Sequence, residues 1–301
     1  MAIISGIINN FGMLLVKYVV NKTPKDNRKG NFNKILLKNP IWWLGQLLAL
    51  GVGTIFFIIA QNIIGPSLVP GLMASGLIVL ALGSIKLNKE NITKKEFIGI
   101  ILMIVGVLLL GLSKLDIPIK KINIFDESLQ VRISIFTIIL FSIYFSSNLL
   151  AKKSEKSDFK KISPKGVSVL LAESSGVCFT LSNFWIAPLL ATINIALGNL
   201  FSFTQNEKII AVIIFIISAL ILVLVNIFGV LRIQESLRFG QASNLIPLQQ
   251  VPIQIGPIFV YFSVFMLSYE LIQIFLITIG VFFIITAGFL LGERKAQIDQ
   301  I

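Results

Sequence analysis

IIAVIIFIISALILVLVNIFGVL, residues 209–231, is a continuous apolar stretch in which Ser218 and Asn226 are the only polar side chains. A bilayer hydrocarbon core about 30 Å thick is crossed by about 20 residues of α-helix. Backbone groups in that core must be hydrogen-bonded within the protein, which restricts spanning structures to helices and closed barrels. An unbroken apolar run of this length favours a helix and predicts a membrane protein.

Eight more apolar stretches of spanning length occur along the chain. The nine predicted spans cover residues 3–20, 41–63, 66–85, 97–113, 133–151, 167–186, 209–231, 239–262 and 269–292. Residues 3–20 lack the basic start and small-residue cleavage site of a removable signal peptide, so we count them as a span. We therefore expect an all-α membrane protein of about nine transmembrane helices.

Basic residues are concentrated in alternate gaps between these spans. The first, third, fifth and seventh gaps and the C-terminal tail hold 20 of the 26 Lys and Arg residues, and the even-numbered gaps hold 5. Short loops rich in Lys and Arg face the cytoplasm. We expect an outside N-terminus and a cytoplasmic C-terminus, with the plasma membrane as the simplest location. The net charge of +12 reflects this orientation and does not indicate a nucleic-acid partner.

Residues 187–203 are also apolar enough to form a tenth helix. Inserting a span there would reverse the side of every later gap and weaken the charge bias. We interpret this stretch as an extracellular re-entrant or interfacial segment.

Two parts of the chain share a weak pattern of prolines and acids. Pro66 and Pro70 lie near the start of the third span and Glu90 follows it, whereas Pro247 lies in the eighth span and Glu270 follows. If spans two to four correspond to seven to nine, the offset of five helices makes the copies inverted in the membrane. Inverted repeats are common in secondary transporters, whose substrate sites lie near the midplane between the repeats.

The longest charged linker separates the proposed halves. We expect an N-terminal half over residues 1–151 with spans one to five, a basic cytoplasmic linker over 152–166, and a C-terminal half over 167–301 with spans six to nine. The fifth span precedes the second repeat, so the repeats divide the nine spans as four and five.

Glu173 is the acid that lies well inside a predicted span. A carboxylate within a membrane is costly unless it faces a cavity or a partner, and it usually marks an ion path. Thr180 shares its helical face. Glu173 is therefore our candidate for binding a cation or proton, and our candidate metal ligand. The structural alternative is that Glu173 reaches the membrane interface or pairs with Lys17.

The eighth span is the most polar predicted helix. Its prolines free backbone carbonyls, which are tolerated where protein or a hydrated cavity satisfies them. A solute path along this helix would be lined by Ser243, Asn244, Pro247, Gln250 and Gln254. The alternative is that these side chains form hydrogen bonds between packed helices. Lys17 of the first span is also a candidate for the path, and Asn10 of that span is a weaker one.

Several functional classes lack the residues they need. The chain has no His, so it has no His-based triad and no His metal site. It has no Gly-Lys-Ser/Thr phosphate-binding loop. The lone Cys178 forms no disulfide within the chain. We predict that the protein is not an enzyme and carries no cofactor.

Two segments resemble a known family. NPIWWLG, residues 39–45, follows the first span and a basic linker and resembles the NIPA-type magnesium transporters of the drug/metabolite transporter superfamily. SNLIP, residues 243–247, is similar to that family's penultimate helix, where small polar residues precede a proline. In the second span, where that family usually carries a Gly-Glu pair, residues 51–54 read GVGT.

The resemblance implies a nine-helix, inverted-repeat secondary transporter that works by alternating access. It implies a divalent cation such as Mg2+ as solute, with Glu173 as a ligand. A small organic metabolite or drug, exchanged or coupled to protons, is the alternative solute. A non-transporting membrane scaffold is a third possibility. The lipid bilayer is the expected environment, and a homodimer is left open.

Overall fold

The computed structural model describes residues 1–23, 32–64, 68–114, 123–156, 164–198 and 206–292, and every regular element in these ranges is helical. Two short π-helical turns, η2 and η4, interrupt otherwise α-helical stretches. The elements are α1 (Ala2–Lys22), α2 (Phe32–Leu37), α3 (Pro40–Gln46), η2 (Leu47–Val52), α4 (Gly53–Ile64), α5 (Leu68–Met73), α6 (Gly76–Lys86), α7 (Lys94–Leu112), α8 (Glu127–Lys156), α9 (Pro164–Gly198), α10 (Asn206–Phe239), α11 (Ala242–Phe259), η4 (Val260–Val264) and α12 (Leu271–Gly292).

Within these described ranges, eight helical stretches are long and apolar enough to cross a bilayer. They are Ala2–Lys22, Pro40–Phe57, Lys94–Leu112, Glu127–Lys153, Gly166–Ile193, Ile209–Phe239, Ala242–Val264 and Leu271–Leu291. Each corresponds to a predicted span, and only the third predicted span has no such counterpart. The prediction of an all-α membrane protein is confirmed at this level.

The third predicted span, 66–85, is broken into α5 and α6 by a turn at Ala74 and Ser75. The Ser75 hydroxyl donates to the carbonyl of Leu72 at 2.6 Å, and its amide donates to the same oxygen at 3.3 Å. A serine side chain that binds a nearby carbonyl competes with helix continuation. The third predicted span is therefore two short helices in the structure.

Residues 187–198 continue α9, which passes through Pro188 and ends at Gly198. The hydroxyl of Thr192 donates to the Pro188 carbonyl at 2.8 Å within the same helix. The expectation of a re-entrant segment was therefore wrong for these residues, and they do not form a separate tenth helix. Residues 199–203 of that predicted segment lie outside the described residues.

Both ends of the predicted linker 152–166 are helical in the structure. The helix α8 continues to Lys156, and α9 begins at Pro164. The intervening residues 157–163 lie outside the described residues.

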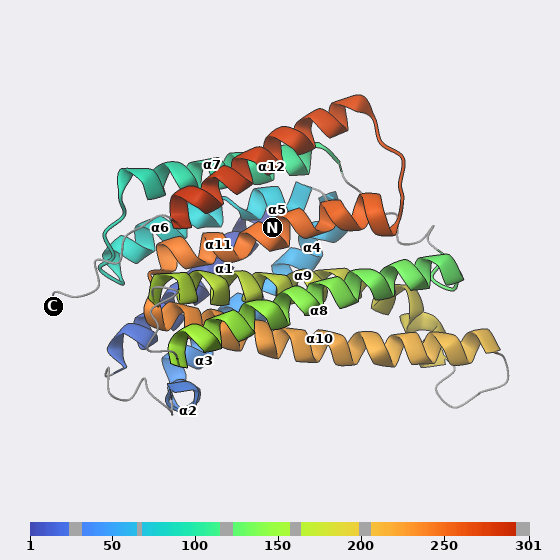
Figure 1. Cartoon of the computed structure of the whole chain (residues 1–301), viewed down its shortest axis with the longest axis horizontal. Coiled ribbons are helices and arrows are strands. Elements are labelled where there is room, and N and C mark those ends of the chain that lie inside the picture. The colour runs from blue at the N-terminus through green and yellow to red at the C-terminus, as the bar shows by residue number, and fades with distance from the viewer. Residues whose placement is uncertain (24–31, 65–67, 115–122, 157–163, 199–205, 293–301) are drawn as a thin grey trace.

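Two helices organise the packing (Figure 1). The main partners of α1 are α3, η2, α4, α5 and α6, and the main partners of α9 are α8, α10 and α11. The helices α7 and α12 pack on each other, and residues from both halves form one shared apolar cluster. The fold therefore has two helical groups joined by α7, α12 and a common core.

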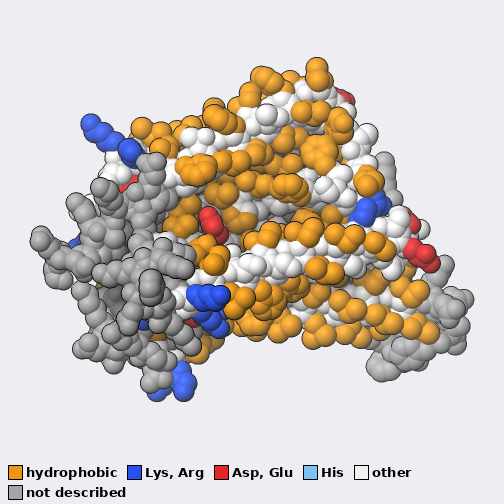
Figure 2. Space-filling view, in the orientation of Figure 1, with side chains coloured by type: hydrophobic (Ala, Val, Ile, Leu, Met, Phe, Trp, Pro, Cys, Tyr) orange, Lys and Arg blue, Asp and Glu red, His pale blue; other side chains and the backbone are white. Residues whose placement is uncertain are grey.

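Large apolar side chains face outward along α8, α10 and α12. Ile138, Leu220 and Phe289 are 63%, 58% and 71% exposed. Figure 2 shows hydrophobic side chains covering much of the visible face, with the visible Lys and Arg toward its two ends. Soluble monomers rarely expose apolar patches this extensive, so this surface fits lipid contact.

Candidate functional site

The polar residues predicted along α11 divide into two groups in the structure. Ser243, Asn244 and Pro247 are buried, whereas Gln250 and Gln254 are half-buried. The amide of Gln254 donates to the Gln250 side-chain oxygen at 3.4 Å. The helix therefore does not present one uniform polar face, because its first turn is enclosed by other helices.

The first turn of α11 is capped by an acid from the other half of the chain. Glu90, which is buried in the connection between α6 and α7, accepts hydrogen bonds from the amides of Ala242 at 2.9 Å and Ser243 at 3.1 Å. Gln241 at the N-cap position makes no side-chain cap bond. A carboxylate is favourable at a helix N-terminus, where free amides carry partial positive charge.

A second buried acid lies beside it. Glu96 accepts a bond from the side-chain amide of Asn244 at 2.5 Å. Its other oxygen accepts from the Thr93 amide at 2.6 Å in a capping box at the start of α7. The sequence motif Thr-x-x-Glu at 93–96 is the signal that predicts this capping box. Our sequence reasoning assigned neither Glu90 nor Glu96 to a site, because Glu90 served only as a marker of the weak repeat and the gap that holds both was considered for its basic charge.

Lys17 of α1 lies beside the C-terminal end of α10, which precedes the first turn of α11. Its ammonium donates to the carbonyls of Leu237 at 2.6 Å and Gly240 at 2.5 Å, and the residue is 5% exposed. A cation is favourable at a helix C-terminus. Lys17 and Glu173, which we considered as an alternative pair, thus lie in different surroundings, since Lys17 is buried and Glu173 is exposed on α9.

The exposed position of Glu173 bears on its candidate role as a metal ligand. Mg2+ prefers several oxygen ligands, usually including a carboxylate. No group of three His, Cys, Asp or Glu side chains able to hold a metal gathers in the part of the chain that the structure describes. A cation at Glu173 would therefore be completed by amide, hydroxyl, carbonyl or water oxygens.

Asn10 and Thr180 occupy matching positions on α1 and α9. The Asn10 amide donates to the Gly6 carbonyl at 2.9 Å, and the Thr180 hydroxyl donates to the Gly176 carbonyl at 2.9 Å. Both are buried. Each lies against a glycine of a later helix, Gly76 for Asn10 and Gly256 for Thr180.

The match between α1 and α9 extends to the residues that precede Asn10 and Thr180. The Ser5 hydroxyl donates to the Gly53 carbonyl at 2.7 Å, and the Ser175 hydroxyl donates to the Gly229 carbonyl at 2.7 Å. The next residue in each helix is a glycine at a close crossing. A Cβ on Gly6 would lie 2.2 Å from the Met73 carbonyl oxygen, and one on Gly176 would lie 2.3 Å from the Gln249 carbonyl oxygen. Both crossings therefore need a residue without a side chain.

Gln249 also belongs to the second crossing, and our sequence reasoning gave it no role. Its side-chain amide donates to the Ser175 hydroxyl at 2.8 Å. Helical spacing on α11 cannot reveal this bond, since the acceptor lies on α9.

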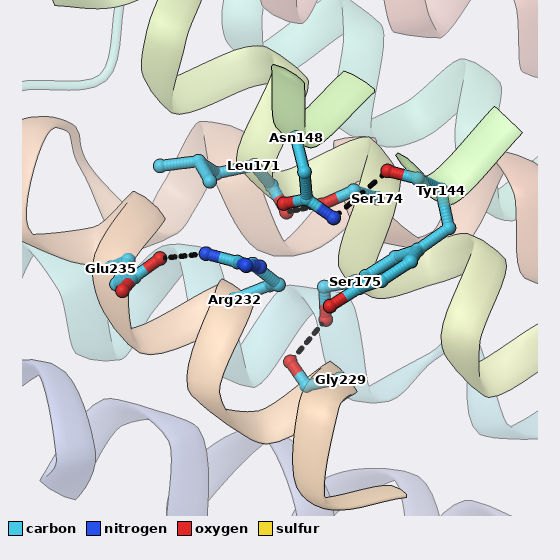
Figure 3. Close-up of polar contacts among 8 residues, drawn as sticks. All are labelled: Tyr144, Asn148, Leu171, Ser174, Ser175, Gly229, Arg232 and Glu235. Atoms are coloured by element: carbon cyan, nitrogen blue, oxygen red, sulfur yellow. Dashed lines mark hydrogen bonds and ion pairs between the residues drawn. The ribbon is translucent and has the colours of Figure 1, made fainter. Parts of the chain in front are cut away.

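A polar cluster between α8, α9 and α10 adjoins the second crossing, whose Ser175–Gly229 bond Figure 3 shows beside it. Arg232 forms an ion pair with Glu235 at 2.5 Å and lies near the Tyr144 ring. The Asn148 amide donates to the Tyr144 carbonyl at 2.8 Å. These contacts are mostly between residues three or four positions apart on one helix, so this cluster mainly supports packing.

Comparison of the chain with protein-family models, curated proteins and solved structures found no match to any of the three.

Proposed function

We propose that this protein is a secondary transporter built from two inverted repeats, of the drug/metabolite transporter type. One repeat comprises α1 to α7 and the other comprises α9 to α12, with α8 as an additional helix between them. Together with the broken third span, this gives nine membrane segments. The solute moves by alternating access, as the two repeats rock about a central site.

The matched crossings of α1 and α9 carry the proposal. In each, a Ser-Gly pair bonds one neighbouring helix through the serine and packs tightly on another through the glycine. The two Ser-Gly pairs are 170 residues apart, and their partners Gly53 and Met73 are each 176 residues from their counterparts Gly229 and Gln249. Such agreement between contacts far apart in sequence supports a duplicated unit.

The contact between α7 and α12 supports the inversion. A Cβ on Gly106 would lie 2.8 Å from the Gly280 carbonyl oxygen, and one on Gly280 would lie 2.9 Å from that of Gly106. Gly99, earlier in α7, lies against Ala287 and Leu291, which are later in α12. The two helices therefore run antiparallel with a reciprocal contact, which is expected where a two-fold axis relates equivalent helices.

The solute pathway in this proposal passes between spans one, three, six and eight. Glu173 binds or relays a cation, and Gln250 and Gln254 contact the solute. Broken helices near the midplane are frequent in transporter sites, and the break between α5 and α6 lies beside Gly6 and Asn10. Mg2+ is the solute suggested by the resemblance, while the neutral amides and hydroxyls near both crossings equally suit a polar organic solute.

Uptake into proteoliposomes of the purified protein tests this function. Mg2+ should be compared with a panel of amino acids, sugars and cationic drugs, using empty liposomes as the baseline. Saturable Mg2+ flux would support a divalent cation as the solute if Glu173→Gln abolishes it. The exposed control Glu127→Gln should leave that flux intact. Flux of an organic solute that Gln250→Leu alters would support the alternative. Absence of flux for every solute would favour a scaffold.

A further inference from the structure

We propose that Lys17, Glu90 and Glu96 form a latch that closes the predicted cytoplasmic end, and that release of this latch opens the solute pathway to the cytoplasm. The proposal rests on the transporter function proposed above. We use "latch" for these three residues together with their acceptor and donor groups at residues 237–244.

The latch joins the first half of the protein to the connection between α10 and α11 in the second half. Lys17 holds the last carbonyls of α10, and Glu90 holds the first amides of α11. Glu96 adds a bond to Asn244 one residue later. Both sides of the connection between α10 and α11 are therefore fixed by charges from the first half.

The charges on the first half are held in place locally. The Glu90 amide donates to the Ser84 carbonyl at 2.9 Å, and Glu96 is fixed by its capping box with Thr93. Separation of the halves would remove the helix ends that compensate Lys17 and Glu90, and the Asn244 amide that donates to Glu96. A buried ion without compensation is costly, so the latch can open only if water replaces the lost partners. This gives two stable arrangements, one closed and dry and the other open and hydrated.

Several buried polar atoms beside the latch have no hydrogen-bond partner among the described residues. They include the hydroxyls of Ser84 and Ser243 and the side-chain oxygen of Asn244, on residues that are 0%, 0% and 7% exposed. Buried polar groups are normally satisfied, and exceptions call for an explanation. Hydration of this interface in an open arrangement would provide these atoms with partners.

The apolar packing around α1 and α9 also differs between the two ends of the protein. The shared cluster brings Val16 and Val20 of α1 together with Ile233 and Leu237 of α10 at this end. Toward the start of α1, Ala2, Ala60 and Val69 form a cluster drawn from the first half. The cluster around Leu181, Phe184 and Val264 is drawn from α8 to η4. Around α1 and α9 the two repeats thus meet at the latch end and form separate clusters at the other end, where α7 and α12 keep the halves in contact through Leu110 and Ile277.

Labelling of a cysteine within the latch tests the proposal. Ser243→Cys is introduced into a Cys178→Ser background, and inside-out membrane vesicles are treated with a membrane-impermeant maleimide. The thiol should react slowly while the latch is intact. Glu90→Ala removes two charge-assisted bonds and should raise the labelling rate about tenfold or more. Glu235→Ala is the matched control, since its ion pair with Arg232 lies within α10, and its labelling should stay slow.

An unchanged labelling rate in folded Glu90→Ala would overturn the latch. If that variant does not fold, Glu90→Gln preserves the side-chain size and one acceptor oxygen. Hydrogen exchange of the Ala242 and Ser243 amides should then be faster in Glu90→Gln than in the wild type, and equal exchange would also overturn the proposal.

The labelling needs no solute, so the two proposals fail separately. Faster labelling in Glu90→Ala without flux of any solute in the wild type would retain the latch and reject the transporter. Flux in the wild type with labelling unaffected by Glu90→Ala would retain the transporter and reject the latch.

Discussion

Replacement of Gly6 by Ala should destabilise the protein, because the new methyl group cannot fit between α1 and the end of α5. An ideal Cβ at Gly6 would lie 2.2 Å from the Met73 carbonyl oxygen and 2.8 Å from the Met73 Cα. Real Cβ atoms essentially never come within 3.0 Å of such atoms, so the backbone must retreat by at least 0.8 Å. Overpacking of this kind typically costs about 1–3 kcal/mol.

Part of this cost is offset by helix propensity. Ala is favoured over Gly in a helix interior by up to about 1 kcal/mol. Gly51→Ala is the matched control, because the nearest atom to its Cβ would be the Leu47 Cγ at an ordinary 3.8 Å. It adds the same methyl group without a clash and should be neutral or stabilising.

Thermal unfolding of detergent-purified protein measures the difference. Cys178 is 2% exposed, so a thiol-reactive fluorophore will report unfolding through this single native cysteine. Relative to Gly51→Ala, which gains the same helix propensity, a loss of about 1–3 kcal/mol lowers Tm by about 2–6 °C in a protein of this size. Gly176→Ala, at the matched crossing, should lower Tm by a similar amount. The reasoning is refuted if Gly6→Ala unfolds at the same temperature as Gly51→Ala.

Three further substitutions should lower the stability of the protein, each by a different route. Ser175→Ala removes the hydroxyl that donates to the Gly229 carbonyl and accepts from the Gln249 amide, and should cost about 1–3 kcal/mol of stability. The control Ser142→Ala, at an exposed serine, should cost little. The Tm of each variant measures the two effects. Asn39→Ala removes the side-chain oxygen that accepts from the Ile41 and Trp42 amides at the start of α3, and should cost about 0.5–2 kcal/mol; an unchanged Tm would contradict the capping role. Lys17→Met keeps most of the length of the side chain but loses both bonds to the end of α10, and should lower Tm by more than Asn39→Ala, which a direct comparison of the two variants checks.

The sequence was sufficient to predict most of the membrane helices, because long apolar runs have few alternatives in a bilayer. The third span failed because the break at Ser75 depends on one local hydroxyl bond that a hydropathy pattern does not register. The extension of α9 through Pro188 was missed because a proline can be accommodated within a membrane helix when neighbouring groups satisfy the freed backbone.

Predictions about the site were limited by a different factor. Helical spacing grouped Ser243 with Gln254 on one face, yet the structure joins Ser243 to Glu90 and Asn244 to Glu96. Spacing describes the faces of a single helix, whereas these roles depend on the helix that packs against it. The roles assigned to Glu173, Gln250 and Gln254 remain predictions for the transport experiments.

The length of α9 has a consequence for the lipid that surrounds the protein. Its 35 residues extend for about 52 Å at 1.5 Å per residue, well beyond a hydrocarbon core of about 30 Å. The neighbouring α10 has 34 residues and packs extensively on α9, so the pair must tilt together or project from the membrane as a unit. Hydrophobic mismatch of this kind favours thicker bilayers. Acyl-chain length is therefore expected to influence this protein's stability, independently of any solute.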